Sequence, residues 1–95
     1  MKLISVSVSD KPDKKYKAIF DNNGRTKTTH FGQKTADDYT ITKDKEQRER
    51  YRTRHAKDLE THDVTRAGYL SYHLLWGSSS NLQKNIAEYR RRFNL

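Results

Sequence analysis

Residues 16–31 read YKAIFDNNGRTKTTHF, and this stretch decides the fold of the first third of the chain. Its centre, Asp21-Asn22-Asn23-Gly24-Arg25, predicts a tight β-hairpin, because Asn and Gly adopt the positive φ angles that such a turn requires. The run 16–20 before the turn is apolar and aromatic, and the run 26–31 after it is rich in threonine, so each predicts a strand. We expect Gly32 to end the second of these strands.

A further strand is predicted before the hairpin. Polar and apolar side chains alternate over residues 3–8 with the period of two that is typical of a strand. Pro12 lies in a predicted turn over residues 10–13, where its missing N–H removes no hydrogen bond from a sheet. We therefore expect residues 1–14 to form an edge strand or an extended arm.

Three helices are predicted after the strands. Thr42 is placed to cap the first, over residues 43–57, which is polar almost all round. Charged residues spaced four apart in it are suited to pairing. These pairs are Asp44 with Arg48, Lys45 with Glu49, and Glu46 with Arg50. Such a helix either stands exposed or lies against a charged surface.

The two later helices hold most of the apolar residues of the second half. Asp63 is placed to cap the second helix, over residues 64–76, and Gly77 to end it. Ser80 and Gln83 have the spacing of a capping box for the third. The apolar stripe of that third helix consists of Leu82, Ile86, Tyr89 and Phe93.

The predicted fold class is therefore α+β, with an N-terminal antiparallel β-hairpin or small sheet followed by three helices, in a single small basic domain over residues 1–95. Only 32% of the residues are hydrophobic, although 11% are aromatic. Because disordered chains are poor in aromatic residues, we expect a thin, aromatic-rich core. Contacts with partner proteins are expected to complete the burial of this core. The tyrosines and Trp76 are expected in that core before any role in stacking on bases.

The chain carries 20 Lys and Arg against 12 Asp and Glu, which gives a net charge of +8. Such an excess favours nucleic acid, an anionic membrane surface or an acidic protein surface as the partner. The absence of cysteine excludes disulfides and thiolate chemistry. No stretch approaches the roughly 20 apolar residues of a membrane span, and the first residues lack the apolar core of a signal peptide. We expect no transmembrane segment.

No constellation of residues predicts catalysis. Asp37 and Asp38 are adjacent and do not face one another, so we expect a turn or a helix start there rather than acid–base chemistry. The glycines are isolated and form no phosphate-binding loop. The histidines fall in different predicted elements, are expected at the surface or at edges, and predict no metal site. They are His30, His55, His62 and His73. We predict that the protein is not an enzyme and uses no cofactor.

The best candidate for a functional site is a basic run in the first helix. It consists of Arg48, Arg50, Arg52 and Arg54, with Lys57. At about 100° per residue, Arg50, Arg54 and Lys57 share one face of a helix and Arg48 and Arg52 another. Three interpretations remain open: a helix that binds phosphates, a solvated helix with internal ion pairs, and a helix that docks on a carboxylate-rich partner.

A second basic cluster, Arg90-Arg91-Arg92, lies near the end of the third predicted helix. Cations are favoured at that end of a helix. If Phe93 belongs to the core, part of this cluster points to solvent or to a partner. Together with the run in the first helix, it completes the set of candidate partner-binding or phosphate-binding residues.

A long, ordered string of motifs runs through residues 15–95. It consists of Gly24-Arg25-Thr26-Lys27, Thr29-His30-Phe31-Gly32, Asp38-Tyr39-Thr40, Lys43-Asp44-Lys45, Arg48-Glu49-Arg50-Tyr51, Arg54-His55, Thr65-Arg66-Ala67-Gly68-Tyr69-Leu70-Ser71, Leu74-Leu75-Trp76 and Tyr89-Arg90-Arg91-Arg92-Phe93. This string resembles an uncharacterised family of small basic proteins of nucleocytoplasmic large DNA viruses. The chain departs from that family at Thr61-His62-Asp63-Val64-Thr65, where members have a proline and often a tryptophan, so the entry into the second helix is expected to differ.

The resemblance implies a viral setting and no particular activity. In such particles, small basic proteins serve as minor capsid or cement proteins, or in DNA packaging. Our first hypothesis is a minor capsid component that contacts neighbouring capsid proteins through its Tyr- and Trp-rich helices and the charged helix over residues 43–57. An exposed strand over residues 3–8 is able to extend a partner's sheet in addition. The expected location is the virion, and the host cytoplasm or virus factory during assembly.

Two alternatives remain open. The first is a nucleic-acid-binding protein, for viral DNA packaging or regulation, whose arginine-rich helices contact phosphates. The second concerns the partner of a structural protein: the anionic surface of an inner membrane attracts Lys and Arg as well. Clustered cations beside accessible aromatic rings favour nucleic acid, whereas scattered charge and an unpaired strand favour a capsid component.

Overall fold

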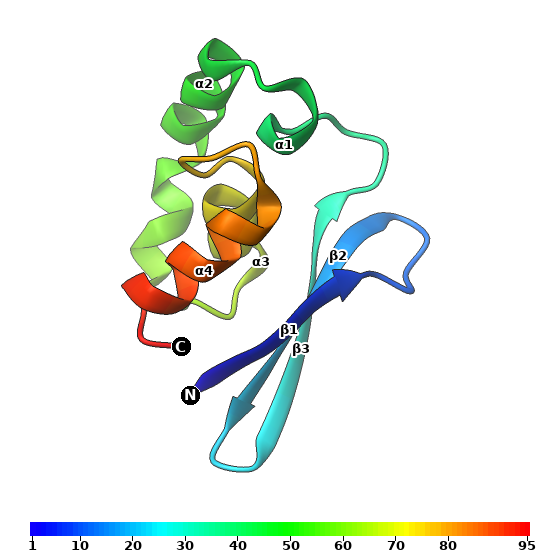
Figure 1. The fold of residues 1–95 in the computed structure, drawn as a ribbon, viewed down its shortest axis with the longest axis vertical. Coiled ribbons are helices and arrows are strands. Elements are labelled where there is room, and N and C mark those ends of the chain that lie inside the picture. The colour runs from blue at the N-terminus through cyan, green and yellow to red at the C-terminus, as the bar shows by residue number, and fades with distance from the viewer.

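The computed structural model describes all residues, 1–95. An antiparallel three-stranded sheet, in the order β1-β2-β3, comes first and the helices follow. The strands are β1 (Lys2–Val8), β2 (Lys14–Asn22) and β3 (Arg25–Gln33). The helices are α1 (Tyr39–Thr42), α2 (Lys45–His55), the 3₁₀-helix η1 (Ala56–Thr61), α3 (Ala67–Leu70), the π-helix η2 (Ser71–Leu75) and α4 (Leu82–Arg92). The predicted α+β class is confirmed. All helices cover one face of the sheet, and the two ends of the chain lie close together (Figure 1).

The turn between β2 and β3 is the predicted hairpin. Asn23 and Gly24 have φ angles of 54° and 86°, as a two-residue turn of this hand requires. The Gly24 N–H donates to the Asp21 carboxylate at 3.0 Å. The turn fixes the register of the pair, in which Tyr16 lies opposite Phe31.

Gly32 has a different role from the one expected, because β3 continues through it to Gln33. Its φ is +78°, and a Cβ there would lie 2.8 Å from the Leu75 Cδ1 atom. The residue therefore provides both a left-handed backbone conformation and the close approach of η2 to the sheet. The sequence pattern alone shows neither requirement.

The core lies between the inner face of the sheet and the helical layer, and it is rich in aromatic side chains, as predicted. Its buried members are Leu3, Ala18, Phe20, Phe31, Tyr39, Tyr69, Leu70, Leu74, Leu75, Trp76, Ile86 and Tyr89. The Tyr89 hydroxyl donates to the Val64 carbonyl at 2.7 Å, and burial raises its pKa well above the usual range. The predicted stripe of α4 is confirmed, because Ile86 and Tyr89 are buried and Leu82 and Phe93 pack against the core.

The helix predicted over residues 43–57 is divided into α2 and η1 and begins at Lys45. The short helix α1 precedes it and was not predicted. Asp38 caps α1 by accepting a hydrogen bond from the Thr40 N–H, which confirms the helix-start role expected of the acidic pair. Asp44, rather than Thr42, caps α2 and accepts from two N–H groups of its first turn. The three predicted ion pairs four apart do not form; Arg48 instead pairs with Glu49 at 3.1 Å.

The second predicted helix starts at Ala67, three residues later than expected, because Asp63 caps only a turn and accepts from Thr65. These bonds lower the pKa of the Asp63 carboxyl. The segment then widens into η2, where the Trp76 N–H donates to Ser71 five residues back. Gly77 follows without a positive φ, but a Cβ there would lie 2.1 Å from the His73 carbonyl oxygen. Asn81, rather than Ser80, caps α4.

Candidate functional site

The basic residues that the sequence marks as candidates do not form one surface. Three of them make intramolecular hydrogen bonds to main-chain carbonyl groups: Arg48, Arg52 and Arg90. Exposed side chains are Arg50, Arg54, Lys57, Arg91 and Arg92. Whether these residues bind a partner or a phosphate stays a prediction.

Arg48 and Arg52 share the inner face of α2 and attach this polar helix to the rest of the protein. The Arg52 Nη1 donates to the Trp76 carbonyl at 2.8 Å, and its guanidinium lies 4.3 Å from the centre of the Tyr72 ring. Arg48 donates to the carbonyls of Gly77 and Ser78. Because α2 buries no residue of its own, it is held to the rest of the protein by these arginine contacts and by the stacking of Tyr51 on Trp76.

Arg90 lies against the beginning of β1. Its Nε and Nη2 donate to the Leu3 carbonyl at 3.2 and 3.0 Å, and Nη2 also reaches the Ile4 carbonyl at 3.3 Å. The Leu3 N–H donates to the Leu95 carbonyl at 3.3 Å. The end of the chain therefore covers the outer edge of β1 at its first residues.

The rest of the outer edge of β1 is open. The Ser9 N–H donates to the Lys15 carbonyl, and the direction of main-chain groups alternates along an antiparallel strand. The N–H and C=O groups of Val6 and Val8 therefore point away from β2, and no other element pairs with them. We call these groups the β1 edge. Residues 2–8 thus form an edge strand rather than an extended arm, and only the second half of that strand is free to pair.

Apolar side chains are exposed beside the β1 edge. The large hydrophobic residues with the highest exposure are Met1 at 48%, Ile4 at 53%, Val8 at 73% and Ile41 at 59%. Three of these four lie in β1 or directly before it. Ile4 lies at a bulge between Leu3 and Ser5, where the register of β1 against β2 shifts. An open edge beside apolar side chains is suited to pairing with a strand of another protein.

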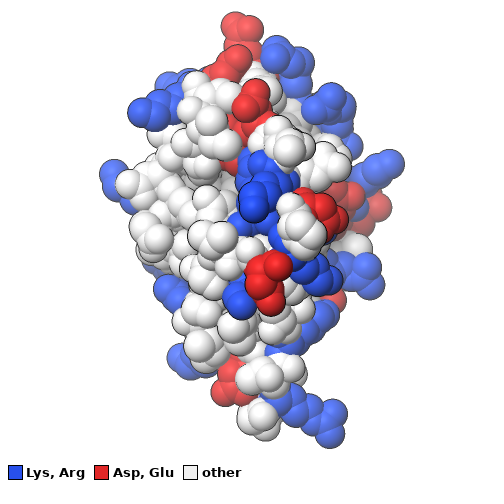
Figure 2. All heavy atoms as spheres, turned by 90° about the vertical axis from the view of Figure 1, so that its right-hand side faces the viewer, with Lys and Arg blue, Asp and Glu red and all other residues white.

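On one side of the molecule, charges of both signs are interspersed (Figure 2). In Figure 2, which shows the side of the molecule at the right of Figure 1, acidic side chains lie among the basic ones and uncharged residues cover much of one half. Five exposed cations of the candidate set make no ion pair: Arg50, Arg54, Lys57, Arg91 and Arg92. The predicted division of the basic run into two faces is confirmed for the arginines of α2, of which Arg48 and Arg52 lie on the inner face and Arg50 and Arg54 on the outer one.

A groove of about 620 Å³ runs between the end of β3, α2 and α3. Three stacked rings, those of Trp76, Tyr51 and His55, are among the residues that line it, with centroid distances of 4.4 and 4.1 Å. Burial raises the pKa of Tyr51 to about 12, so its hydroxyl keeps its proton. The Lys15–Asp38 ion pair, 2.5 Å long, lies in the same groove.

The histidines differ in their surroundings more than the sequence suggests. His30 shares a hydrogen bond of 2.7 Å with Ser9, and His55 one of 3.1 Å with Asp58. His73 is not at the surface or an edge as expected, but half-buried among the rings of Tyr69, Tyr72, Tyr89 and Phe93.

No group of three or more acidic or histidine side chains is placed to hold a metal ion. None of the helices combines the length and the apolar character that a membrane crossing requires.

Fold and surface together define a small basic α+β protein with an open sheet edge and with arginines that serve as internal contacts. Residues 4–55 match the model of DUF5754, a family of unknown function, and the chain belongs to this family. The matched segment runs from β1 to the end of α2, so it includes the β1 edge and the four arginines of the basic run, but neither Lys57 nor Arg90–Arg92. No curated protein and no solved structure matches the chain.

Proposed function

We propose that this protein is a structural virion component, a minor capsid or cement protein that binds neighbouring capsid proteins. The observation that carries the proposal is the β1 edge, where the main-chain groups of Val6 and Val8 have no partner and exposed apolar side chains lie beside them. A strand of a capsid protein that paired there would satisfy these groups and bury Ile4 and Val8.

The distribution of charge supports a protein partner. Arg48, Arg52 and Arg90 donate hydrogen bonds to main-chain carbonyls of the protein itself, and acidic side chains lie among the basic ones on the face that Figure 2 shows. Interspersed charges of both signs are suited to the polar rim of a protein interface. They are less suited to the continuous positive face that follows a phosphate backbone.

The viral setting rests on the resemblance to small basic proteins of nucleocytoplasmic large DNA viruses. In that setting, the expected location is the virion, with the host cytoplasm or the virus factory as the place of assembly. An inner-membrane surface is a further expected contact, because the net charge of +8 attracts anionic lipid headgroups.

Nucleic-acid binding is the second candidate, and the unpaired cations of α2, η1 and α4 favour it. If Arg50, Arg54, Lys57, Arg91 and Arg92 each contact a phosphate, the logarithm of the affinity for duplex DNA falls with a slope of about −4.5 against the logarithm of salt concentration. Binding with that slope that persists at physiological salt would replace the first proposal. Weak binding that disappears there supports it.

The direct test uses two substitutions at one position. Val8→Pro removes the outward N–H of the β1 edge and leaves the hydrogen bonds of β1 to β2 intact, whereas Val8→Thr keeps the N–H and a similar volume. Each variant is mixed with capsid shells of the virus that encodes it and sedimented. We expect co-sedimentation of the wild-type protein and the Thr variant, and its loss in the Pro variant. Equal sedimentation of the two variants, or none for the wild type, would refute the proposal. A circular-dichroism melt checks that both variants are folded.

A further inference from the structure

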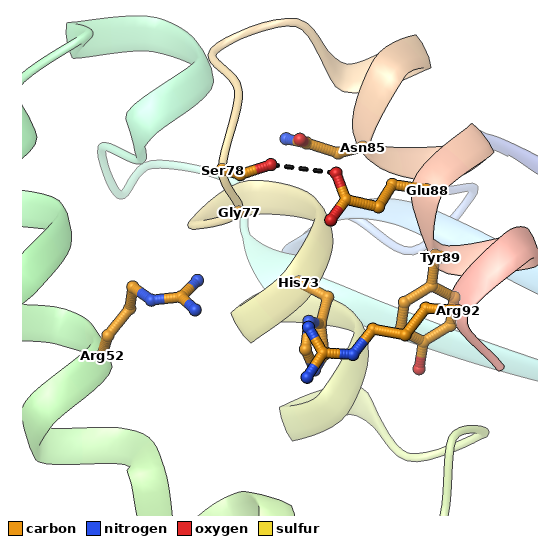
Figure 3. A pocket seen from close by; sticks show the side chains of 8 residues that line it. All are labelled: Arg52, His73, Gly77, Ser78, Asn85, Glu88, Tyr89 and Arg92. Atoms are coloured by element: carbon orange, nitrogen blue, oxygen red, sulfur yellow. Dashed lines mark hydrogen bonds between the residues drawn. The ribbon is translucent and has the colours of Figure 1, made fainter.

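A small pocket of about 40 Å³ lies between α2, the end of η2, the loop after it and α4. Its lining is almost entirely polar, and Figure 3 shows the side chains concerned. They are Arg52, His73, Gly77, Ser78, Asn85, Glu88, Tyr89 and Arg92. The pocket has room for roughly three water-sized groups, which is the size of a carboxylate.

Two arginines from different helices approach this pocket without an acid between them. The Arg52 guanidinium comes from α2 and the Arg92 guanidinium from α4, where it extends across His73 (Figure 3). Neither arginine takes part in an ion pair. Arg52 uses Nη1 for the Trp76 carbonyl, which leaves its other N–H groups available. Like charges that share a pocket are unfavourable unless an anion lies between them.

Glu88, the acid that lines the same pocket, is hydrogen-bonded to a serine and not to either arginine. Its carboxylate accepts a hydrogen bond of 3.0 Å from the Ser78 hydroxyl. Asn85 is likewise satisfied, since its amide donates to the carbonyls of Leu74 and Ser79 and accepts from the Ser79 N–H. The donors that remain free to bind a ligand are those of Arg52, Arg92 and the His73 ring.

We propose that this pocket binds a carboxylate of a partner protein, from an Asp or Glu side chain or a chain end, held between Arg52 and Arg92. The forked guanidinium group matches the two oxygens of a carboxylate. This inference rests on the proposed function and names the chemical group that the partner contributes. The pocket lies on the helical side of the molecule, so it would form a second contact in addition to the β1 edge.

His73 reports on the occupancy of this pocket. Burial is the main cause that lowers its pKa to about 4; Arg92 and Arg52 lower it further and Glu88 opposes them. The uncharged rings of Tyr69, Tyr72, Tyr89 and Phe93 surround the remaining sides. A carboxylate between the arginines would offset their charge, and the pKa of His73 would rise.

The test is a nuclear magnetic resonance titration of the full chain with acetate, with inorganic phosphate in a parallel series. We expect acetate to produce saturable shifts at His73 and Ser78 and to raise the pKa of His73. Arg92→Gln should weaken acetate binding roughly tenfold or more, as expected for the loss of a charge-assisted hydrogen bond. Arg91→Gln, a change at an exposed neighbour outside the pocket, should leave the binding unchanged.

Three results would overturn the inference. The first is an absence of saturable acetate shifts at His73, and the second is an equal loss of acetate affinity in the Arg91 and Arg92 variants. The third is saturable shifts with phosphate but none with acetate, which would assign the pocket to phosphate instead. None of these outcomes bears on sedimentation with shells through the β1 edge. Conversely, loss of sedimentation in Val8→Pro leaves acetate binding intact, so failures of the two proposals are distinguishable.

Discussion

Arg52 in α2 donates a hydrogen bond of 2.8 Å to the main-chain carbonyl of Trp76, the residue that ends η2. Carbonyl groups in the last turn of a helix lack partners within the helix, and Trp76 is buried. A charged side chain from the polar helix α2 thus provides a hydrogen-bond partner for the carbonyl group at the end of the apolar helix η2. This contact explains how α2 is held in place although it has no apolar face.

Replacement of Arg52 by Ala should destabilise the protein by about 1.5–3 kcal/mol, because a hydrogen bond from a charged group is lost and a buried carbonyl is left unpaired. The exposed Arg54 offers a matched control on the same helix, and Arg54→Ala should change the stability by less than about 0.5 kcal/mol. Urea unfolding of the three proteins measures both values. Similar values for the two variants would show that Arg52 has no structural role.

Stability should fall as the pH is lowered from about 6.5 to about 4. The folded protein lowers the pKa of His73 to about 4, so between these values the unfolded chain binds more protons. The contribution of His73 is therefore fully present above the unfolded pKa of about 6.5. It is lost as the pH falls towards the folded pKa, by about 3 kcal/mol in all. His73→Phe should flatten this slope, and an unchanged slope in that variant would assign it to other groups. Denaturant unfolding across the pH series provides the measurement.

Gly77→Ala should be among the most damaging substitutions in the chain. The added Cβ would lie 2.1 Å from the His73 carbonyl oxygen, which is main chain and unable to move without distorting η2. We expect a loss of about 3 kcal/mol or more. Gly24→Asn is the control, because Asn tolerates a positive φ and nothing lies within 4 Å of the new Cβ. Thermal melts that ranked the two variants equally would contradict this interpretation of Gly77.

Asp38→Asn should cost about 3 kcal/mol, since it leaves the Lys15 ammonium largely buried without its counter-charge. Asp38 also caps α1, a role that the amide oxygen of Asn keeps. The measured loss therefore reports mainly on the ion pair. Asp37→Asn, at the exposed neighbouring position, should be nearly neutral in the same urea experiment. A neutral Asp38→Asn would mean that solvent reaches Lys15.

Features of local origin could be predicted from the sequence. The Asn23-Gly24 turn, the strand over residues 3–8 and the stripe of α4 each depend on residues close together in the chain. The strict alternation within that strand is interrupted by the bulge between Leu3 and Ser5. The separation of Arg48 and Arg52 from the outer cations of α2 also follows from helical geometry alone. Local patterns thus predicted the class of the fold and the order of its elements.

Features that depend on distant contacts were not predicted. The close approach of Gly32 to Leu75 arises where η2 meets the sheet. The burial of His73 arises within the helical layer, where rings of α3, η2 and α4 surround it. The roles of Arg48, Arg52 and Arg90 depend on carbonyl groups that tertiary packing brings near them. A run of arginines has the same appearance in a sequence whether its partners are phosphates, carboxylates or main-chain oxygens.

The most direct test of the proposal that this protein is a virion component is lysine cross-linking of intact particles of the proposed source virus, followed by mass spectrometry. Lys2 and Lys11 flank β1, whereas Lys45 and Lys57 lie on α2 and η1. Our account predicts that the protein is present in the particle and that Lys2 and Lys11 form links to capsid proteins. Absence from purified particles, or links from Lys45 and Lys57 to packaged nucleoprotein with none from the flanks of β1, would contradict it.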